Sequence, residues 1–298
     1  MTKHVMPAQS VFAGAKGNRL VGDVFGTEGP AVMLLHGGGQ TRHAWRATAA
    51  QLARRGWTAY AIDQRGHGDS EWVADGAYSF ADFAGDVKAL AAQLAQRHGE
   101  APAAIGASMG GIASMLAEGE AFRDEGAHVL SSLVLVDITP RVDFEGVDKV
   151  QGFMRAHAKE GFATIEEAAD AVAQYLPHRP RPKSTEGLKK NLRLGEDGRW
   201  RWHWDPRFMD GRKRFDPDRT KLESAMLDAA RHIKVPALLV RGGSSELVQE
   251  EHAREFLQLV PHAEYVDVGG ARHMVAGDAN DHFATAVVDF LSRMHRQA

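Results

Sequence analysis

Short apolar runs alternate along the chain with stretches of helical periodicity, and this alternation constrains the fold more than any other feature. Six such runs are AVMLLH, TAYAID, PAAIGA, SLVLVDI, PALLVRG and AEYVDVG, at residues 31–36, 58–63, 102–107, 132–138, 236–242 and 263–269. Between them, FADFAGDVKALAAQLAQRHG places Phe83, Val87, Leu90 and Leu94 on one helical face. Strands that alternate with crossover helices predict an α/β fold, with a mostly parallel sheet covered by helices on both faces.

Two parts of the chain depart from this alternation. Near the N-terminus, the runs around Val11 and Leu20 fit an antiparallel hairpin at the edge of the sheet. After the fourth run, the chain contains the helical segment TIEEAADAVAQYL and the aromatic cluster RWRWHWDPRFMD, but no apolar strand before the fifth run. We therefore expect a core formed by residues 1–139 and 231–298, with a helical cap inserted at residues 140–230.

Composition excludes several classes of protein. With 298 residues, 44% of them hydrophobic, and a net charge of -3, the chain has the composition of an ordinary globular protein. It contains no cysteine, which excludes disulfides and thiolate chemistry. There is no signal-peptide pattern, and no apolar run approaches the ~20 residues of a membrane span, so we expect a cytoplasmic protein. Residues 178–221 carry fourteen Lys or Arg against seven Asp or Glu, which favours a solvated cap surface because no nucleic-acid motif accompanies them.

The segment GASMGG contains the pattern G-x-S-x-G once, with Ser108 at its centre. The pattern follows an apolar run and begins a helical segment, which is the setting of a serine nucleophile on a strained turn between strand and helix. A serine hydroxyl needs a base to remove its proton, and the base needs a carboxylate to orient it. Ser108 is therefore the predicted nucleophile, and a helix N-cap is the alternative role for it.

Position along the chain selects the base among the fifteen histidines. His273, in VGGARHMV, follows the last apolar run, where a loop brings an imidazole back over the carboxyl ends of the strands. His36 and His67 precede the serine and are flanked by glycines, so they fit structural roles as partners of loop backbone better than catalytic ones. The predicted base is His273.

Two carboxylates compete for the role of the acid. Glu246 lies in LLVRGGSSELVQEE, just past the fifth run, and Asp137 ends the fourth run in LVLVDITP. Both lie between Ser108 and His273, as the order serine, acid, histidine requires, and the position expected for such a fold favours Glu246 as the acid, with Asp137 as the alternative. Otherwise Glu246 would be an exposed residue before a helix, and Asp137 would brace the hinge of the cap.

The three glycines in AVMLLHGGGQTRHAW raise a different question, because a glycine-rich turn after a strand can also bind phosphate. The P-loop pattern needs a lysine that is missing here, and the dinucleotide pattern fails because Arg42 stands where its last glycine should be. H-E-x-x-H is also absent, so we expect no metal. The backbone N–H groups of Gly38 and Met109 are instead the predicted oxyanion hole, with Gly37 and Gly39 as other sources of the second donor.

Taken together, Ser108 in its turn, HGGG, DQRGHGDS, RGGSSE and GGARHM resemble the α/β-hydrolase superfamily, particularly its compact capped esterases and cofactor-free haloperoxidase-like members. The resemblance extends from about residue 20 to residue 294 and implies the α/β-hydrolase fold and no cofactor. It also implies structural roles for Asp63, Arg65 and His67. Relatives carry Asp more often than Glu in the RGGSSE position, so Glu246 is a departure from their pattern.

These features predict a serine hydrolase that cleaves carboxylic esters through an acyl-serine intermediate, with lactones and aryl amides as neighbouring substrates. The alternatives are a perhydrolase or haloperoxidase-like enzyme, a C–C bond hydrolase with the same triad, or a ligand receptor without activity. We expect a pocket between cap and core for a small molecule with an apolar or aromatic group. Its predicted lining is Gly37, Trp45, Trp72, Trp200, Trp202, Trp204, Phe208 and Met209. No nucleic-acid or membrane partner is expected, and the sequence is compatible with a homodimer.

Overall fold

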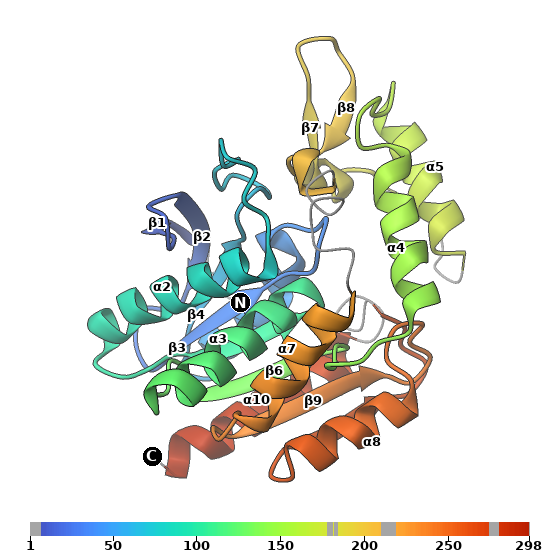
Figure 1. Ribbon diagram of the computed structural model, residues 1–298. Helices are drawn as coiled ribbons and strands as arrows, with labels where there is room; N and C mark the ends of the chain where they lie inside the picture. Colours follow the sequence, from blue (N-terminus) through green and yellow to red (C-terminus); the bar gives the residue numbers. More distant parts are fainter. Residues whose placement is uncertain (1–6, 178–180, 182–183, 210–218, 274–279, 298) are drawn as a thin grey trace.

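The computed structural model describes residues 7–177, 181, 184–209, 219–273 and 280–297 (Figure 1). Its centre is an eight-stranded sheet with the strand order β1-β2-β4-β3-β5-β6-β9-β10. The bounds are β1 Ala8–Ala13, β2 Arg19–Phe25, β3 Ala31–Leu35, β4 Thr58–Asp63, β5 Ala103–Ala107, β6 Ser132–Val136, β9 Ala237–Gly242 and β10 Glu264–Val268. The pairs β1–β2 and β2–β4 are antiparallel, and the other pairs are parallel. The predicted α/β fold and the antiparallel edge hairpin are both confirmed.

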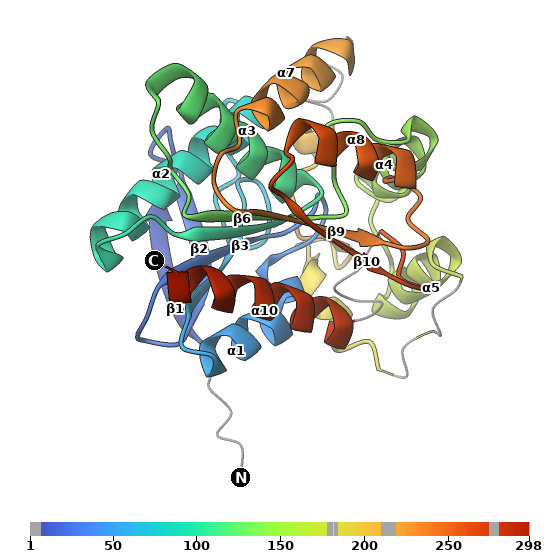
Figure 2. The same cartoon turned by 90° about the horizontal axis from the view of Figure 1, so that it is seen from below.

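Helices cover both faces of this sheet (Figure 2). On one face lie α1 Arg46–Arg54 and α10 Asn280–Gln297, and a short 3-10 helix, η1 Arg42–Trp45, precedes α1. On the other face lie α2 Phe80–His98, α3 Met109–Glu125, α7 Arg219–Arg231 and α8 Glu250–Leu259. All residues of β3, β4, β6 and β9 are buried, as expected for parallel strands between two helical layers.

Helix α2 illustrates how local sequence sets an element. The Ser79 hydroxyl accepts a hydrogen bond from Asp82 N at 3.0 Å, while the Asp82 carboxylate accepts one from Ser79 N at 2.9 Å. This reciprocal pair satisfies backbone donors at the start of the helix. The predicted apolar face of α2 is buried in the core, at Phe83, Val87, Leu90 and Leu94.

Between β6 and α7, the described chain forms the helices α4 Phe144–Ala156 and α5 Ile165–Tyr175. The short 3-10 helix η2 Leu188–Asn191 follows, and then a small hairpin of β7 Leu192–Leu194 with β8 Trp200–Trp202. Figures 1 and 2 place α4, α5 and the hairpin together at one end of the sheet. The interval was expected to be helical and without an apolar strand, and the structure adds this hairpin to the helices. Because the Trp-Arg-Trp stretch alternates apolar and charged residues with a period of two, it fits a strand without being an apolar run.

Two segments of the expected cap pack on the core instead of standing apart from it. In residues 203–209, Asp205 N donates to Gly66 O at 2.7 Å, and the Tyr78 hydroxyl donates to the Asp205 carboxylate at 2.5 Å. Helix α7 lies against α3, where a Cβ on Gly119 would come within 2.2 Å of Ala229 O. The boundaries of the cap at residues 140 and 230 therefore stay a prediction. Residues 178–180, 182–183 and 210–218 of the predicted cap lie outside the residues that the structure describes.

The close contact of α3 with α7 predicts an unusual response to an alanine. Gly119→Ala should lower the free energy of unfolding. The new methyl group would overpack against the Ala229 backbone, which typically costs about 1–3 kcal/mol or more, whereas the better helix propensity of alanine contributes ~1 kcal/mol. The matched control is Gly152→Ala in α4, where a Cβ meets nothing within 4 Å, and it should stabilise the protein. Chemical denaturation measures both, and a Gly119→Ala variant at least as stable as wild type would contradict the expectation.

Candidate active site

Ser108 is the single residue that connects β5 to α3, in the strand-turn-helix setting expected from its sequence. Its φ of 46° and ψ of -112° lie in a region that residues with a side chain rarely adopt, so the turn is strained. A Cβ on Gly110 would lie 2.4 Å from Leu35 O, which explains why the residue two positions after the serine is a glycine. Ser108 occupies the N-cap position of α3, but its hydroxyl makes no capping hydrogen bond there, so the side chain does not cap the helix.

The HGGG loop lies beside this turn, since a Cβ on Gly37 would be 3.5 Å from the Ser108 Cβ. Two of the three glycine amides have protein acceptors: Gly37 N donates to Gln40 Oε1, and Gly39 N donates to His67 Nε2, each at 3.1 Å. Among the described residues, Gly38 N has no acceptor. Met109 is the first residue of α3, where backbone N–H groups lack helical partners. Within the described residues, Gly38 N and Met109 N, the two amides predicted as the oxyanion hole, thus have no acceptor, whereas Gly37 N and Gly39 N donate to side chains.

His36 and His67 brace this loop, as their glycine-flanked positions predicted. His36 Nδ1 donates to Gly37 O at 2.8 Å, and its Nε2 accepts from Gln64 N at 3.1 Å. This pattern requires a neutral ring, and complete burial lowers the pKa of His36 accordingly. His67 Nδ1 lies 3.0 Å from Arg65 O, which leaves Nε2 to accept from Gly39 N. Both imidazoles are therefore occupied in holding the glycine loop.

The charged residues of DQRGHGDS also have buried structural partners, in agreement with the roles that the resemblance implied. The Asp63 carboxylate accepts hydrogen bonds from Arg42 N at 2.6 Å and Asp69 N at 2.9 Å, and it pairs with the Arg42 guanidinium. Arg65 forms two hydrogen bonds to Asp86, at 2.6 and 2.7 Å. These ion pairs fix the loop between β4 and α2 on which the glycine loop rests.

The predicted base, His273, has Asp137 as its carboxylate partner. His273 Nδ1 lies 2.8 Å from Asp137 Oδ2, although the two residues are far apart in the sequence. Asp137 directly follows β6, has a φ of 49° and is completely buried. Its other oxygen, Oδ1, accepts a hydrogen bond from Gly242 N at 2.9 Å. The His273 side chain keeps 17% of its surface exposed, so its ring lies at the boundary between the core and the site.

The expectation that Glu246 orients His273 is corrected by the structure, because Glu246 pairs with a different residue. Its Oε1 accepts a hydrogen bond from Arg272 Nη1 at 2.7 Å. Partial burial opposes ionisation of this carboxyl, but the Arg272 guanidinium outweighs it and lowers the pKa of Glu246. β6 and β9 are neighbouring parallel strands, so the loops that follow them reach the same end of the sheet, and sequence order alone could not separate the two acids.

Several predicted pocket residues gather around the glycine loop. A Cβ on Gly38 would be 3.5 Å from the Phe208 ring, which also packs against His67 with 4.9 Å between ring centroids. Trp204 packs edge-on against the same Phe208 ring, with 6.2 Å between the ring centroids. The other predicted residues in the interval after β6 are Trp202, which packs against Phe162, Trp200, which is half-buried in the hairpin, and Met209, which is buried.

Two predicted pocket residues lie elsewhere. Trp45 is buried on the opposite face of the sheet, in the core formed with α1 and α10, where it packs against Phe283 with 6.0 Å between ring centroids. Its expected place in the pocket was therefore wrong, because the 3-10 helix η1 turns the side chain under the sheet. Trp72 is 38% exposed, so it is a surface residue of its loop.

Three residues near the site were not found by sequence reasoning. Gln40 accepts from Gly37 N, and Met154 of α4 packs so closely on Gly39 that a Cβ there would be 2.9 Å from the Met154 Cε. Ser245 donates a hydrogen bond to Asp137 Oδ2 at 2.5 Å. Ser245 directly precedes Glu246 in RGGSSE, so this motif was a sequence signal for a polar residue near the site.

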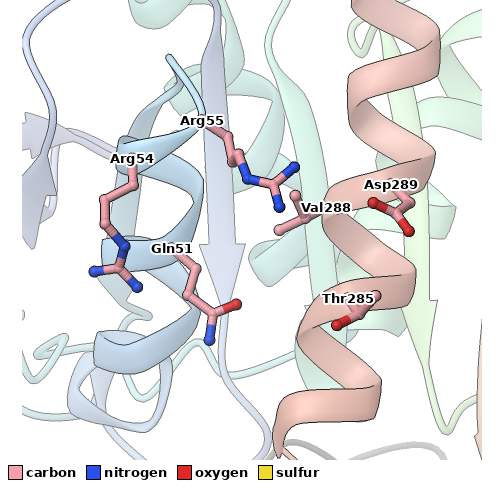
Figure 3. Close-up of a pocket in the computed structure, with 6 residues that line it drawn as sticks. All are labelled: Gln51, Arg54, Arg55, Thr285, Val288 and Asp289. Atoms are coloured by element: carbon pink, nitrogen blue, oxygen red, sulfur yellow. The ribbon is translucent and has the colours of Figure 1, made fainter.

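A surface pocket between α1 and α10 is separate from this site (Figure 3). Figure 3 shows Gln51, Arg54 and Arg55 on one wall and Thr285, Val288 and Asp289 of α10 on the other. None of the predicted site residues lines it. Within the described ranges, no helix is long and apolar enough to span a membrane.

Comparison with known proteins identifies the family. The family model described as alpha/beta hydrolase fold matches residues 30–279. The chain belongs to the α/β-hydrolase family. This α/β hydrolase is 30% identical to an esterase of Mycobacterium tuberculosis over 243 residues, which cover 80% of this chain and 74% of that one.

Two further similarities span most of the chain. The 2-(acetamidomethylene)succinate hydrolase of Mesorhizobium japonicum is 27% identical over 266 residues, which are 88% of each chain. A crystal structure of E-2-(acetamidomethylene)succinate hydrolase superposes with a TM-score of 0.80 and 24% identity, covering 96% of this chain and 99% of that one. The structural similarity supports the fold, including the region between β6 and β9.

The hydrogen bonds of His36 make a prediction about its protonation. Nuclear magnetic resonance of the imidazole nitrogens should find a neutral ring with the proton on Nδ1, and it should stay neutral as the pH falls through 6.5, the ordinary pKa of histidine. Because the unfolded chain does take up this proton, His36 contributes a loss of stability as the pH falls below that value. The His36→Gln spectrum assigns the resonance, and a ring that titrates at 6.5 or above would refute the bracing role.

Proposed function

We propose that this α/β hydrolase is a serine hydrolase that cleaves carboxylic esters through an acyl-serine intermediate. The observation that carries the proposal is the position of Ser108 on a strained turn, beside a glycine loop whose Gly38 amide has no acceptor among the described residues. The similarity to the esterase of Mycobacterium tuberculosis adds support for hydrolysis of an ester bond.

In this mechanism, Ser108 Oγ attacks the ester carbonyl while His273 Nε2 takes its proton. The carbonyl oxygen becomes negative and accepts hydrogen bonds from Gly38 N and Met109 N, each worth about 3 kcal/mol in comparable sites. His273 then protonates the departing alcohol. Water, deprotonated by the same imidazole, releases the acid from Ser108 and restores the enzyme.

We assign the role of the acid to Asp137 in place of Glu246. A carboxylate on Nδ1 keeps the proton on that nitrogen, so that Nε2 is free to act as the base, and it stabilises the imidazolium that forms. The 2.8 Å contact of His273 Nδ1 with Asp137 Oδ2 has the geometry for this role. Glu246 is neutralised by Arg272 and makes no contact with the imidazole among the described residues.

The surroundings of the glycine loop favour a substrate with an apolar or aromatic group. Phe208 lies against Gly38, with Trp204 behind it, and Met154 of α4 packs on Gly39. These side chains come from the interval between β6 and β9, which we propose to act as the cap over the site. Apolar and aromatic walls with few polar groups are typical of sites for small organic ligands.

Hydrolysis of an amide bond is a second candidate. The hydrolase of Mesorhizobium japonicum, which matches 88% of this chain, acts according to its name on an acetamido compound. The same serine, base and oxyanion hole would serve an amide, with His273 protonating the leaving nitrogen. A panel of aryl esters, lactones, aryl amides, vinylogous diketones and peroxide with a carboxylic acid would separate ester and amide hydrolysis from C–C bond cleavage and perhydrolysis.

Replacing the nucleophile tests the proposal directly. Ser108→Ala should lower kcat/KM for p-nitrophenyl acetate by at least about 10⁴-fold, since the nucleophile is required for the covalent step. A fluorophosphonate probe should label the wild type at Ser108 and leave this variant unlabelled, and denatured wild type should also stay unlabelled. Ester turnover that survives in Ser108→Ala, or labelling at another residue, would refute the mechanism.

The choice between the two acids has its own test. Asp137→Asn should lower kcat by about 10³–10⁴-fold, because the amide no longer holds the required tautomer of His273. Glu246→Gln, the matched control, removes a carboxylate of the neighbouring loop and should reduce kcat by less than about tenfold. Steady-state kinetics with p-nitrophenyl acetate measures both variants, and a larger loss in Glu246→Gln would restore Glu246 as the acid.

A further inference from the structure

The loop that follows β9 reaches the site through Ser245, although its glutamate points elsewhere. Ser245 is buried, with 6% of its surface exposed. Its hydroxyl lies 2.5 Å from Asp137 Oδ2, the same oxygen that contacts His273 Nδ1. Asp137 thus has three hydrogen-bond donors: Gly242 N on Oδ1, and Ser245 Oγ and His273 Nδ1 on Oδ2.

The direction of the Ser245 hydroxyl proton is fixed by its other partners. Ser245 Oγ accepts hydrogen bonds from Leu247 N at 3.1 Å and from Val248 N at 3.0 Å. A hydroxyl has two acceptor lone pairs and one donor. With both lone pairs facing backbone N–H groups, the proton is directed to Asp137 Oδ2, so the serine is a donor to the carboxylate and not an acceptor from it.

We propose that Ser245 is a positioning residue that acts on His273 through Asp137. Its hydroxyl holds Oδ2 in line with His273 Nδ1 and stabilises the ionised carboxylate in a completely buried position. A buried carboxylate needs such donors, since it has lost its hydration. This inference rests on the proposed function, because it assigns a role in a reaction in which His273 is the base.

Most charged groups around Ser245, Asp137 and His273 have partners of their own. Arg272, the residue before His273, forms an ion pair with Glu246. On β9, Arg241 donates to Val248 O and pairs with Asp267. From α5, Tyr175 faces Glu246, and burial together with that negative charge raises the pKa of Tyr175 to about 12. From α4, Lys149 is close enough to act on Glu246. A change at Ser245 removes none of these charged side chains, but it also takes the acceptor away from Leu247 N and Val248 N, so its effect on the loop has to be separated from its effect on Asp137.

Loss of the hydroxyl therefore has a defined signature. In Ser245→Ala, kcat for p-nitrophenyl acetate should fall about tenfold to a hundredfold, the range for a lost hydrogen bond to a charged group, with little change in KM. Asp137 Oδ2 keeps His273 as its remaining donor, which favours the imidazolium. The acidic limb of the kcat/KM profile should therefore shift to higher pH by about 0.5 unit or more. Ser244→Ala, an exposed neighbour in the same loop, should match wild type in both measurements.

A double-mutant cycle separates positioning from loop stability. If Ser245 acts through Asp137, the double variant Asp137→Asn with Ser245→Ala should have nearly the kcat of Asp137→Asn alone. The inference is overturned if Ser245→Ala behaves as Ser244→Ala. It is also overturned if Ser245→Ala lowers kcat without shifting the acidic limb and the two losses multiply, because the serine would then only shape the loop. Turnover that survives in Ser108→Ala is the separate result that refutes the proposed function itself.

Discussion

Two residues with side chains have a left-handed backbone in the described chain, and they lie at the same place in the sheet. Ser108 and Asp137, with φ of 46° and 49°, each follow the last residue of a strand, and those last residues, Ala107 and Val136, are paired in register between β5 and β6. Ser108 N donates to Val136 O, and Asp137 N donates to Val240 O of the next strand. Neighbouring strands thus hold both strained turns, and that strain persists because the parallel sheet leaves neither turn room to relax. The proposed nucleophile and acid therefore depend on one feature, the register of β5, β6 and β9.

The glycine loop depends on a second set of contacts, which come from the adjacent Gln40 and from two distant parts of the chain. Its amides are held by Gln40 and His67, and His67 is in turn fixed by the loop that Asp63 and Arg65 anchor through buried ion pairs. Phe208, which follows the hairpin in the chain, packs against Gly38 of the loop. With its neighbours occupied, Gly38 N is the amide left for a ligand. Such a site is organised before substrate binds, which is the condition under which hydrogen bonds to a developing oxyanion are most effective.

The fold and the proposed nucleophile and base could be predicted because their signals are local. A buried parallel strand is a short apolar run, and the turn at Ser108 needs small residues on either side of the serine. The hairpin at Trp200 was missed because its period of two lies within a charged segment. Trp45 was placed in the pocket because aromatic residues near a site often line it, whereas the direction of its side chain depends on how η1 packs over α10. Such packing is decided by tertiary contacts, which a single sequence does not contain.

The proposal of Asp137 as the acid in place of Glu246 has a physical reason that sequence order cannot supply. β6 and β9 end side by side, so a carboxylate on either loop can reach His273. At residue 272, however, an arginine adjoins the histidine and pairs with Glu246, while Asp137 is buried where donors from β9 and its loop surround it. The loop after β9 thus keeps its connection to the site through the Gly242 amide and the Ser245 hydroxyl instead of through its own carboxylate. The proposed acid thus follows β6, whereas two of its hydrogen-bond donors come from β9 and the loop after it. Both loops are therefore needed to hold His273 in place.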